Sequence, residues 1–382
     1  MHQRWYAGQG RLPPGHAATI SRPVNEAPPL GADVVALTRW LCEIPSPIGE
    51  EQAICEALIA RAAKWRSAGP LTRVLNTIAV PLTRDTGGAR LALVGHTDVV
   101  RTAHDGPVRI EGDRLYGAGS ADMKSGLAAM IAAAEDEALR PRADVTLIFY
   151  AREEGPYAEN ELGPLFSQHP ELARHDLAIC LEPSYSKLQL GCMGSLHAKV
   201  TVRGKTSHSA RPWDGDNAIH KSWSLLRDLH ERAPIDATID GLPYRAVMSA
   251  TMASGGRGRN VIPDGLELNV NYRFLPGVSV EQAEAELRAV VAGRAEVEVF
   301  DRSPSAPPHR DHPLVEKLIA AGVPAVESKQ AWTDVARFAT LGVAAVNWGP
   351  GDQLQAHQRN ESTSIEGLKR GWTILRKFLG DL

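Results

Sequence analysis

The run Leu91-Ala92-Leu93-Val94 continues into Gly95-His96-Thr97-Asp98, so an imidazole and a carboxylate follow an apolar segment at a spacing of two residues. If the run is a buried strand, His96 and Asp98 point the same way, because alternate residues of a strand share a face. A neutral histidine is the commonest metal ligand, and a carboxylate behind it fixes its tautomer and ring angle. Taken alone, the pair also fits a capped strand end without a ligand.

Other segments place acidic residues or a histidine where an expected strand ends or an expected helix begins. They are Glu153-Glu154 after the run 145–150, Glu182 after the run 177–181, His357 in the loop that follows the run 343–348, and Asp122 just before the Ala-rich run 124–139. In open parallel sheets, ligands bind beyond the carboxyl ends of the strands. We therefore expect these side chains to converge with His96 at one edge of a sheet.

Two histidines and three carboxylates are a suitable ligand set for two divalent transition-metal ions bridged by one carboxylate, with the ions about 3.5–4 Å apart. Zinc accepts this set of nitrogen and oxygen ligands. Because Glu153 and Glu154 are adjacent, one of them would bind metal and the other would act as a general base. Considered singly, Asp122 also fits a helix N-cap, and the two glutamates also fit a solvated loop.

The bulk composition limits the classes of protein that the chain can represent. A length of 382 residues favours two domains, and a net charge of −3 argues against a nucleic-acid or anionic-membrane partner. No apolar run approaches the roughly 20 residues of a bilayer span. Cys42, Cys55, Cys180 and Cys192 lack the spacing of paired metal ligands, so we expect buried free thiols and a cytoplasmic location.

The order of apolar runs predicts an α/β protein with a mostly parallel sheet flanked by helices. Strands are expected at 91–94, 145–150, 177–181 and 343–348, and helices at 34–42, 51–65, 124–139 and 365–379. Residues 1–30 lack a hydrophobic segment and are predicted to form a disordered tail. The larger, catalytic domain is expected to comprise residues 31–192 and 302–382.

Between these two segments, the hydrophobic pattern of residues 193–301 changes, which predicts an inserted second domain. Alternating strand patterns lie at 196–203, 247–253, 266–274 and 296–300, with helical patterns at 218–232 and 280–292. The order strand, helix, strand, strand, helix, strand is that of a split βαβ sandwich, which is an α+β, ferredoxin-like arrangement.

The motifs together resemble the M20 family of dinuclear zinc amidohydrolases and exopeptidases. The resemblance lies in Gly95-His96-Thr97-Asp98, Asp122-Met123-Lys124, Glu153-Glu154-Gly155, Leu181-Glu182-Pro183 and Gly204-Lys205-Thr206-Ser207-His208-Ser209, and it extends from about residue 33 to the end. It implies a zinc-exopeptidase-like catalytic domain and an inserted lid that also forms a homodimer.

The resemblance also implies a role for each member of the metal site. His96 and Glu182 would bind one zinc ion, Glu154 and His357 would bind the other, and Asp122 would bridge the two. Cobalt is the alternative metal.

Further roles implied by the resemblance concern catalysis and substrate binding. Asp98 would orient His96, Glu153 would be the catalytic base, and His208 would reach across the dimer to the carbonyl oxygen of the substrate. The remaining residues expected to contact substrate are Arg211, Asn260, Arg273 and Thr333.

Within the family, the chain most resembles the desuccinylases that act on N-succinyl-LL-2,6-diaminopimelate, a small N-acyl amino acid. One departure is Met193 before Gly194-Ser195, where some desuccinylases carry an arginine suited to a carboxylate. Arg211 or another cation would then have to supply the positive charge. The alternatives are an acetylornithine deacetylase, an aminoacylase or a carboxypeptidase of the same family, and a non-catalytic metal-dependent binding protein.

Overall fold

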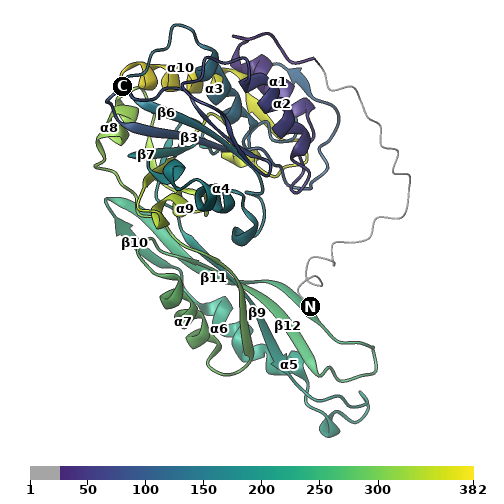
Figure 1. The fold of residues 1–382 in the computed structure, drawn as a ribbon. Helices are drawn as coiled ribbons and strands as arrows, with labels where there is room; N and C mark the ends of the chain where they lie inside the picture. Colours follow the sequence, from purple (N-terminus) through teal and green to yellow (C-terminus); the bar gives the residue numbers. More distant parts are fainter. Residues whose placement is uncertain (1–25) are drawn as a thin grey trace.

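The computed structural model describes residues 26–382, which form a broad α/β body and an elongated lid below it (Figure 1). Most of the expected tail, residues 1–25, lies outside the described residues. The carbonyl oxygens of Pro28 and Pro29 accept hydrogen bonds from Arg61, so fixed contacts begin a few residues before the predicted boundary at residue 31.

The body is built on an eight-stranded sheet with the strand order β1-β2-β6-β3-β7-β15-β8-β14. Its strands are β1 (Thr72–Val74), β2 (Thr77–Pro81), β6 (Asp144–Tyr150), β3 (Arg90–His96), β7 (Leu177–Cys180), β15 (Ala344–Asn347), β8 (Leu188–Leu190) and β14 (Val326–Ser328). The four central strands β6, β3, β7 and β15 run parallel to one another. These are the four strands predicted from the apolar runs, and the mostly parallel sheet is confirmed.

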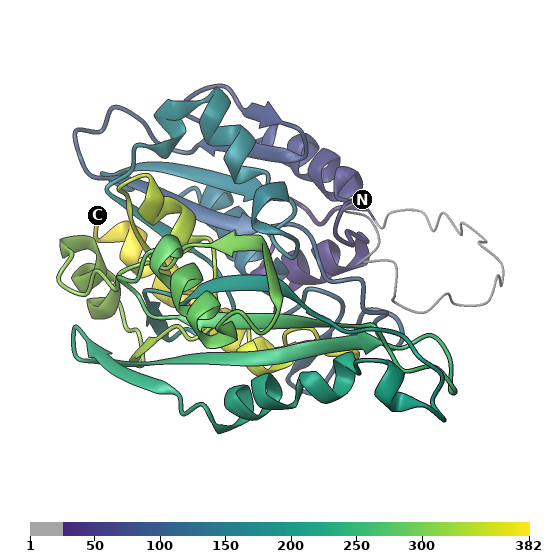
Figure 2. The same cartoon turned by 90° about the horizontal axis from the view of Figure 1, so that it is seen from below.

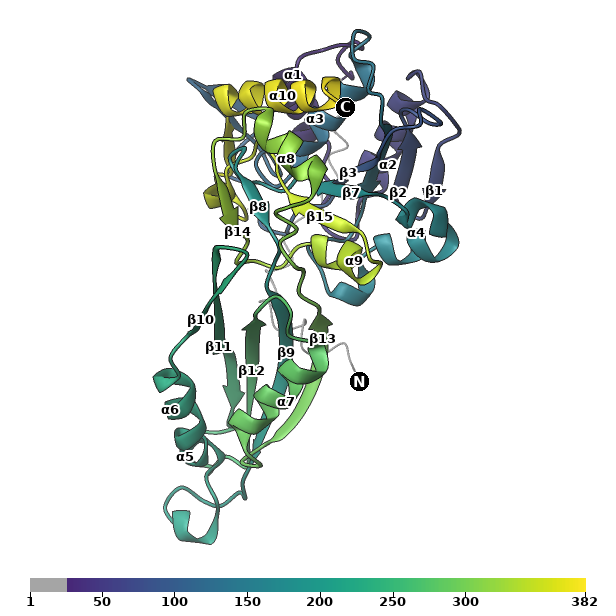
Figure 3. The same ribbon diagram turned by 90° about the vertical axis from the view of Figure 1, so that its left-hand side faces the viewer.

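Helices cover both faces of this sheet, as expected for strands that are apolar on both sides (Figure 3). The helices of the body are α1 (Val34–Glu43), α2 (Gln52–Ala62), α3 (Lys124–Glu135), α4 (Leu162–Gln168), α8 (Pro313–Ala320), α9 (Val335–Thr340) and α10 (Ile365–Gly380). Along β3, Leu91 and Leu93 belong to the core cluster that includes residues of α1, α2, α3 and α10, whereas Ala92 and Val94 belong to the cluster that includes residues of α4 and α9.

Helix α3 ends at Glu135, four residues earlier than the Ala-rich pattern predicts. The cause is Asp136, whose side chain accepts a hydrogen bond from the backbone N–H of Ala138 and closes a local turn. This earlier end leaves the start of α3, next to Asp122, unchanged.

The lid contains a five-stranded antiparallel sheet with the order β10-β11-β12-β9-β13. Its elements are β9 (Gly194–Arg203), α5 (Ala218–Lys221), α6 (Trp223–Glu231), β10 (Ile235–Ile239), β11 (Leu242–Gly255), β12 (Gly265–Phe274), α7 (Val280–Val291) and β13 (Glu296–Ser303). Without β10, the order is that of a ferredoxin-like sheet. The view from below shows α5 and α6 along one side of this sheet (Figure 2).

Two details of the lid differ from the sequence prediction. The helical pattern 218–232 is interrupted at Ser222, which separates α5 from α6. Strand β10 was not predicted, because its residues are exposed or half-buried on both faces and so lack a buried, alternating pattern.

A small third sheet, β16-β5-β4, joins the end of the chain to the body. It consists of β4 (Arg109–Glu111), β5 (Arg114–Tyr116) and β16 (Ser362–Ser364). Because β16 pairs with β5, the loop that carries His357 is held next to the segment that carries Asp122.

Cys42, Cys55, Cys180 and Cys192 are all buried and free, as predicted. Among residues 26–382, no helix is both long and apolar enough to cross a bilayer.

Candidate metal centre

The predicted metal ligands come from segments that meet at the carboxyl edge of the parallel strands. His96 is the last residue of β3, Glu154 follows β6, and Glu182 follows β7. His357 lies between β15 and β16, and Asp122 lies just before α3. The parallel register aligns these strand ends, with His96 opposite Tyr150 and Val94 opposite Cys180. The convergence expected from the sequence is therefore present.

Asp122 stands between the two histidines and offers one carboxylate oxygen to each. The Nε2 atom of His96 lies 3.2 Å from Asp122 Oδ1, and the Nε2 atom of His357 lies 3.5 Å from Asp122 Oδ2. A carboxylate placed in this way can bridge two metal ions. The peptide bond between Asp122 and Met123 is cis.

Each of the other two carboxylates lies near one of the two histidines. Glu154 Oε1 lies 2.9 Å from Nε2 of His357, and Glu182 Oε1 lies 3.9 Å from Nε2 of His96. Potential ligand atoms of His96, Asp122 and Glu154 all lie within 4.8 Å of one another.

One buried atom tests whether this set fits a metal ion. Glu182 Oε1 is buried and accepts no hydrogen bond among the described residues. A buried carboxylate oxygen without a donor is costly unless a cation satisfies it. The orphaned oxygen, the nitrogen and oxygen donors and the shared Asp122 carboxylate together fit a pair of divalent ions.

Asp98 contacts two parts of the site, the ring of His96 and the loop that carries Glu153 and Glu154. Its carboxylate lies 3.6 Å from Nδ1 of His96, and its carbonyl oxygen is closer to the same nitrogen, at 3.0 Å. The two carboxylate oxygens accept hydrogen bonds from the backbone N–H groups of Glu153 and Glu154, at 3.2 and 3.0 Å. The fully buried Asp98 therefore fixes both His96 and the loop that carries the adjacent glutamates.

Glu153 lies in an electrostatic environment that favours uptake of a proton. Burial raises the pKa of Glu153 well above its ordinary value, and the negative charges of Glu182 and Glu154 raise it further. A raised pKa makes a carboxylate a stronger base, as a group that accepts a proton from water must be.

Two of the predicted metal ligands, Glu182 and His357, hold protons tightly when no cation is present. Burial and the charge of Asp122 raise the pKa of Glu182 to about 7. The hydrogen bond to Glu154 raises the pKa of His357 to about 9. Divalent ions would replace these protons, because a metal ligand must offer a free lone pair.

Glu361 is a member of the site that sequence reasoning missed. Its buried carboxylate accepts hydrogen bonds from the backbone N–H groups of Gly119, Ala121 and Asp122, at 2.8, 2.8 and 2.9 Å. The turn that presents Asp122 is thereby held from behind. The available signal was the position of Glu361, four residues after His357 and just before a predicted helix.

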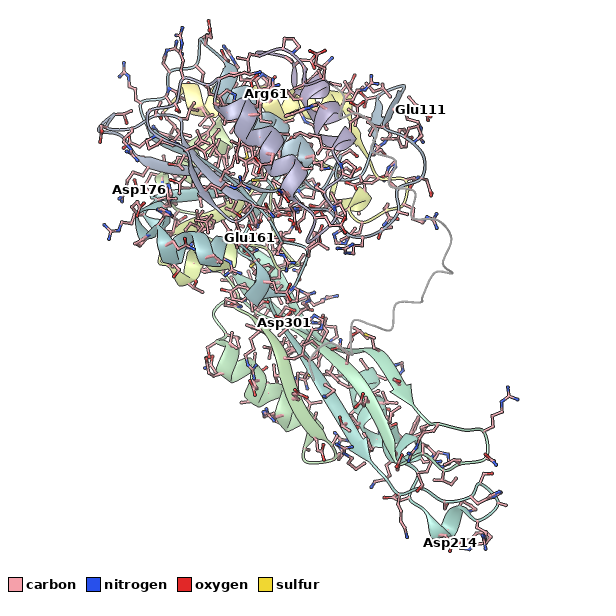
Figure 4. The ribbon with its side chains drawn as sticks, turned by 45° about the vertical axis from the view of Figure 1, so that its right-hand side comes forward. Arg61, Glu111, Glu161, Asp176, Asp214 and Asp301 are labelled. Atoms are coloured by element: carbon pink, nitrogen blue, oxygen red, sulfur yellow. The ribbon has the colours of Figure 1, made fainter. Side chains whose placement is uncertain are left out.

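The residues expected to contact substrate do not gather at this centre within one chain. Arg211 lies 4.0 Å from Asp214, which is at the far end of the lid, whereas Asp301 marks the junction with the body (Figure 4). His208 and Asn260 belong to the same distal loops, because the N–H of Arg211 donates to the His208 carbonyl and the N–H of Ser209 donates to the Asn260 carbonyl.

The other two expected contact residues lie nearer the body. Arg273 lines a groove of about 710 Å³ between β11 and the segment after β14, and none of the metal-site residues lines this groove. Thr333 is buried, and its hydroxyl donates to Asn347 Oδ1 at 2.7 Å.

Comparison with known proteins gives a family match over residues 92–381, to the model described as peptidase family M20/M25/M40. A Corynebacterium glutamicum protein named succinyl-diaminopimelate desuccinylase is 34% identical over 91% of this chain and 96% of its own length. A Mycobacterium tuberculosis protein that carries the same name provisionally is 38% identical over 92% of this chain and 99% of its own.

Solved structures share the fold at much lower sequence identity. A tripeptidase from Staphylococcus aureus superposes with a TM-score of 0.76 at 17% identity, covering 92% of this chain and 98% of that one. An M20 family metallo-carboxypeptidase from Sulfolobus solfataricus gives a TM-score of 0.75 at 16% identity, covering 91% and 99%.

We expect Glu361→Gln to weaken metal binding about tenfold to a hundredfold, because a side-chain amide would turn donor hydrogens toward backbone donors and displace Asp122. Competition with a chromogenic chelator measures the metal affinity. The control is Glu366→Gln, at an exposed position in the first turn of α10. Equal affinities in the two variants would contradict the role of Glu361.

The protons held by the site also predict how pH affects stability. The folded, metal-free protein binds protons more tightly than the unfolded chain at Glu182 and His357, so its stability should fall as pH rises from about 5 to about 8. Over the same range the increase in melting temperature on adding zinc should grow, because fewer protons compete with the metal. Scanning fluorimetry at several pH values measures both trends, and a pH-independent zinc effect would contradict them.

Proposed function

Because this chain belongs to peptidase family M20/M25/M40, we propose that it hydrolyses the N-succinyl amide of N-succinyl-LL-2,6-diaminopimelate to succinate and LL-2,6-diaminopimelate. The observation that carries the hydrolytic activity is the Asp122 carboxylate shared between two histidines, with Glu153 in the loop beside it. The succinyl substrate is supported by the names of relatives that are 34–38% identical over nearly the whole chain.

The proposed cofactor is a pair of divalent ions, with zinc as the metal and cobalt as the alternative. His96 and Glu182 would hold one ion, Glu154 and His357 the other, and Asp122 both. When bound, such ions lower the pKa of water and polarise the carbonyl group of an amide.

Glu153 would move the proton in this reaction. Its carboxylate takes a proton from the attacking water and later delivers it to the departing amine, so that the amide nitrogen leaves in neutral form. Its backbone N–H is held by Asp98, which limits how far the carboxylate can move between these two steps. The surrounding negative charges favour uptake of the proton.

We further propose that two copies associate through the lid and that His208 acts on the substrate bound by the other copy. The part of β11 beyond Ala246 has no strand partner on the side opposite β12 within residues 26–382, so its edge can pair with a second chain. Trp223 and Met252 are exposed apolar side chains on the same lid. A cytoplasmic location remains part of the proposal.

Hydrolysis assays on matched substrates test the proposed reaction. With zinc supplied, kcat/KM for the N-succinyl diamino acid should exceed that for its N-acetyl analogue by at least about a hundredfold, because a site built to pair with a charged acyl group rejects one that lacks it. Glu153→Gln should abolish turnover while leaving the zinc content unchanged. A preference for the acetyl substrate would redirect the assignment to a related deacylase.

Mixing two inactive variants tests whether His208 acts across a dimer. Chains with Glu153→Gln and chains with His208→Ala should each be nearly inactive, but a hybrid dimer contains one site with both residues. After subunit exchange, random pairing should restore about a quarter of wild-type activity. Activity that stays at the level of the separate variants, with hybrids confirmed by native mass spectrometry, would show that His208 does not act in this way.

A further inference from the structure

Lys329 is a largely buried lysine without a role in the reaction described above. Only 7% of its surface is exposed, and its ammonium group has no hydrogen-bond or ion-pair partner among residues 26–382. The buried Lys124, by contrast, donates to the Ile44 carbonyl, and Lys187 pairs with Glu327. An ammonium group at the end of a largely buried side chain, with no partner in the protein, is available to pair with a ligand of opposite charge.

The backbone around Lys329 fixes the direction of its side chain. The residue follows β14, and its N–H donates to the Leu190 carbonyl in the neighbouring strand β8. The side chains on either side, Ser328 and Gln330, both donate to the carbonyl oxygen of Pro243 in the lid. Because alternate residues of an extended segment face opposite sides, Lys329 points away from that contact.

Lys329 points toward the side of the sheet on which the loop leading to His357 lies. Glu327, two residues earlier, shares this side, and its carboxylate accepts a hydrogen bond from Gln189. The Gln189 amide also donates to Oε1 of Gln353, which lies in the loop leading to His357.

The electrostatics of the site agree with this direction. Burial raises the pKa of Asp122, but the hydrogen bond to His96 and the positive charges of His96, His357 and Lys329 bring it below its ordinary value. The charge of Lys329 also opposes the rise in the pKa of Glu182 that burial and Asp122 cause. The positive charge of Lys329 thus favours the ionised form of both carboxylates.

Lys329 also lies beside the first residues of the lid. Its N–H donates to the Leu190 carbonyl, two residues before Cys192, and the Cys192 thiol donates to the carbonyl oxygen of Thr333 at 3.8 Å. The next residue, Met193, is fully buried and offers no charge. Of the cations considered from the sequence, Arg211 lies on the distal loops and Arg273 lines the groove that Ser328 and Gln330 also line.

We propose that Lys329 binds the terminal carboxylate of the acyl group and so selects substrates whose acyl chain ends in a negative charge. This inference rests on the proposed hydrolase function. In this inference, the cation that binds the succinyl carboxylate lies on the segment after β14 and not at position 193.

The experiment compares Lys329→Met with wild type on two substrates of equal size. One is the N-succinyl diamino acid, and the other is its N-succinamoyl analogue, in which a neutral amide replaces the terminal carboxylate. The loss of one charge-assisted contact should lower kcat/KM for the succinyl substrate about thirtyfold to a hundredfold, mainly through KM. The value for the neutral analogue should change less than about threefold.

Two further variants control for charge and for folding. Lys329→Arg keeps the cation and should retain most of the preference for the charged substrate. Lys187→Met removes a partly exposed lysine just before β8 and should leave that preference intact. Activity on the neutral analogue shows whether each variant is folded and contains metal. Inhibition by free succinate, compared with acetate, is a second measure of carboxylate binding and should weaken only in Lys329→Met.

The outcomes separate this inference from the function on which it rests. If wild type fails to hydrolyse the succinyl substrate, the proposed function is wrong. If wild type is active and Lys329→Met keeps the same ratio between the two substrates, Lys329 does not bind the acyl carboxylate. If Lys329→Met loses zinc and activity on both substrates equally, the lysine serves the metal centre, and the inference is overturned.

Discussion

The whole centre depends on one carboxylate, that of Asp122, facing two imidazoles at once. His96 and His357 are far apart in the chain, and they approach opposite oxygens of Asp122 at 3.2 and 3.5 Å. A shared carboxylate tolerates little displacement, since a shift toward one histidine is a shift away from the other. Glu361 fits this constraint, because it accepts hydrogen bonds from three backbone N–H groups in the turn that contains Asp122. The side chain of Asp122 is left free to face the histidines.

This arrangement concentrates negative charge in a buried part of the protein. Burial raises the pKa of Glu153, Glu154 and Glu182, and the negative charges of neighbouring carboxylates raise each of them further. Hydrogen bonds from the backbone stabilise Asp98 and Glu361, but they do not satisfy the groups that face the centre. Cations are needed there, and they divide between the proposed metal ions and Lys329.

The parts of the structure that follow from local pattern could be predicted from the sequence. The strand ending in His96 and the runs before Glu153 and Glu182 are apolar on both faces, which predicts parallel strands whose ends align. The ferredoxin-like order of the lid also follows from its alternating patterns. By contrast, β10 has no buried face, and the end of α3 is set by a side-chain turn at Asp136.

Glu361 and Lys329 could not be identified from pattern, because their importance comes from long-range contacts. Glu361 reaches backbone groups about 240 residues earlier in the chain. Lys329 is significant because it is buried and unpartnered, and burial depends on how β14 packs against β8. His208 presents a different case, since its segment lies at the end of the lid and its expected role requires a second chain.

The order of strands in the central sheet has a consequence for how the protein is made. Strands β7 and β15 are neighbours in that sheet, yet the entire lid is encoded between them. A ribosome must therefore synthesise the whole insertion before the sheet can close, and until then β7 has an open edge next to an unfinished neighbour. His357 emerges later still, so the site proposed for the second metal ion is completed only after β15 has been synthesised.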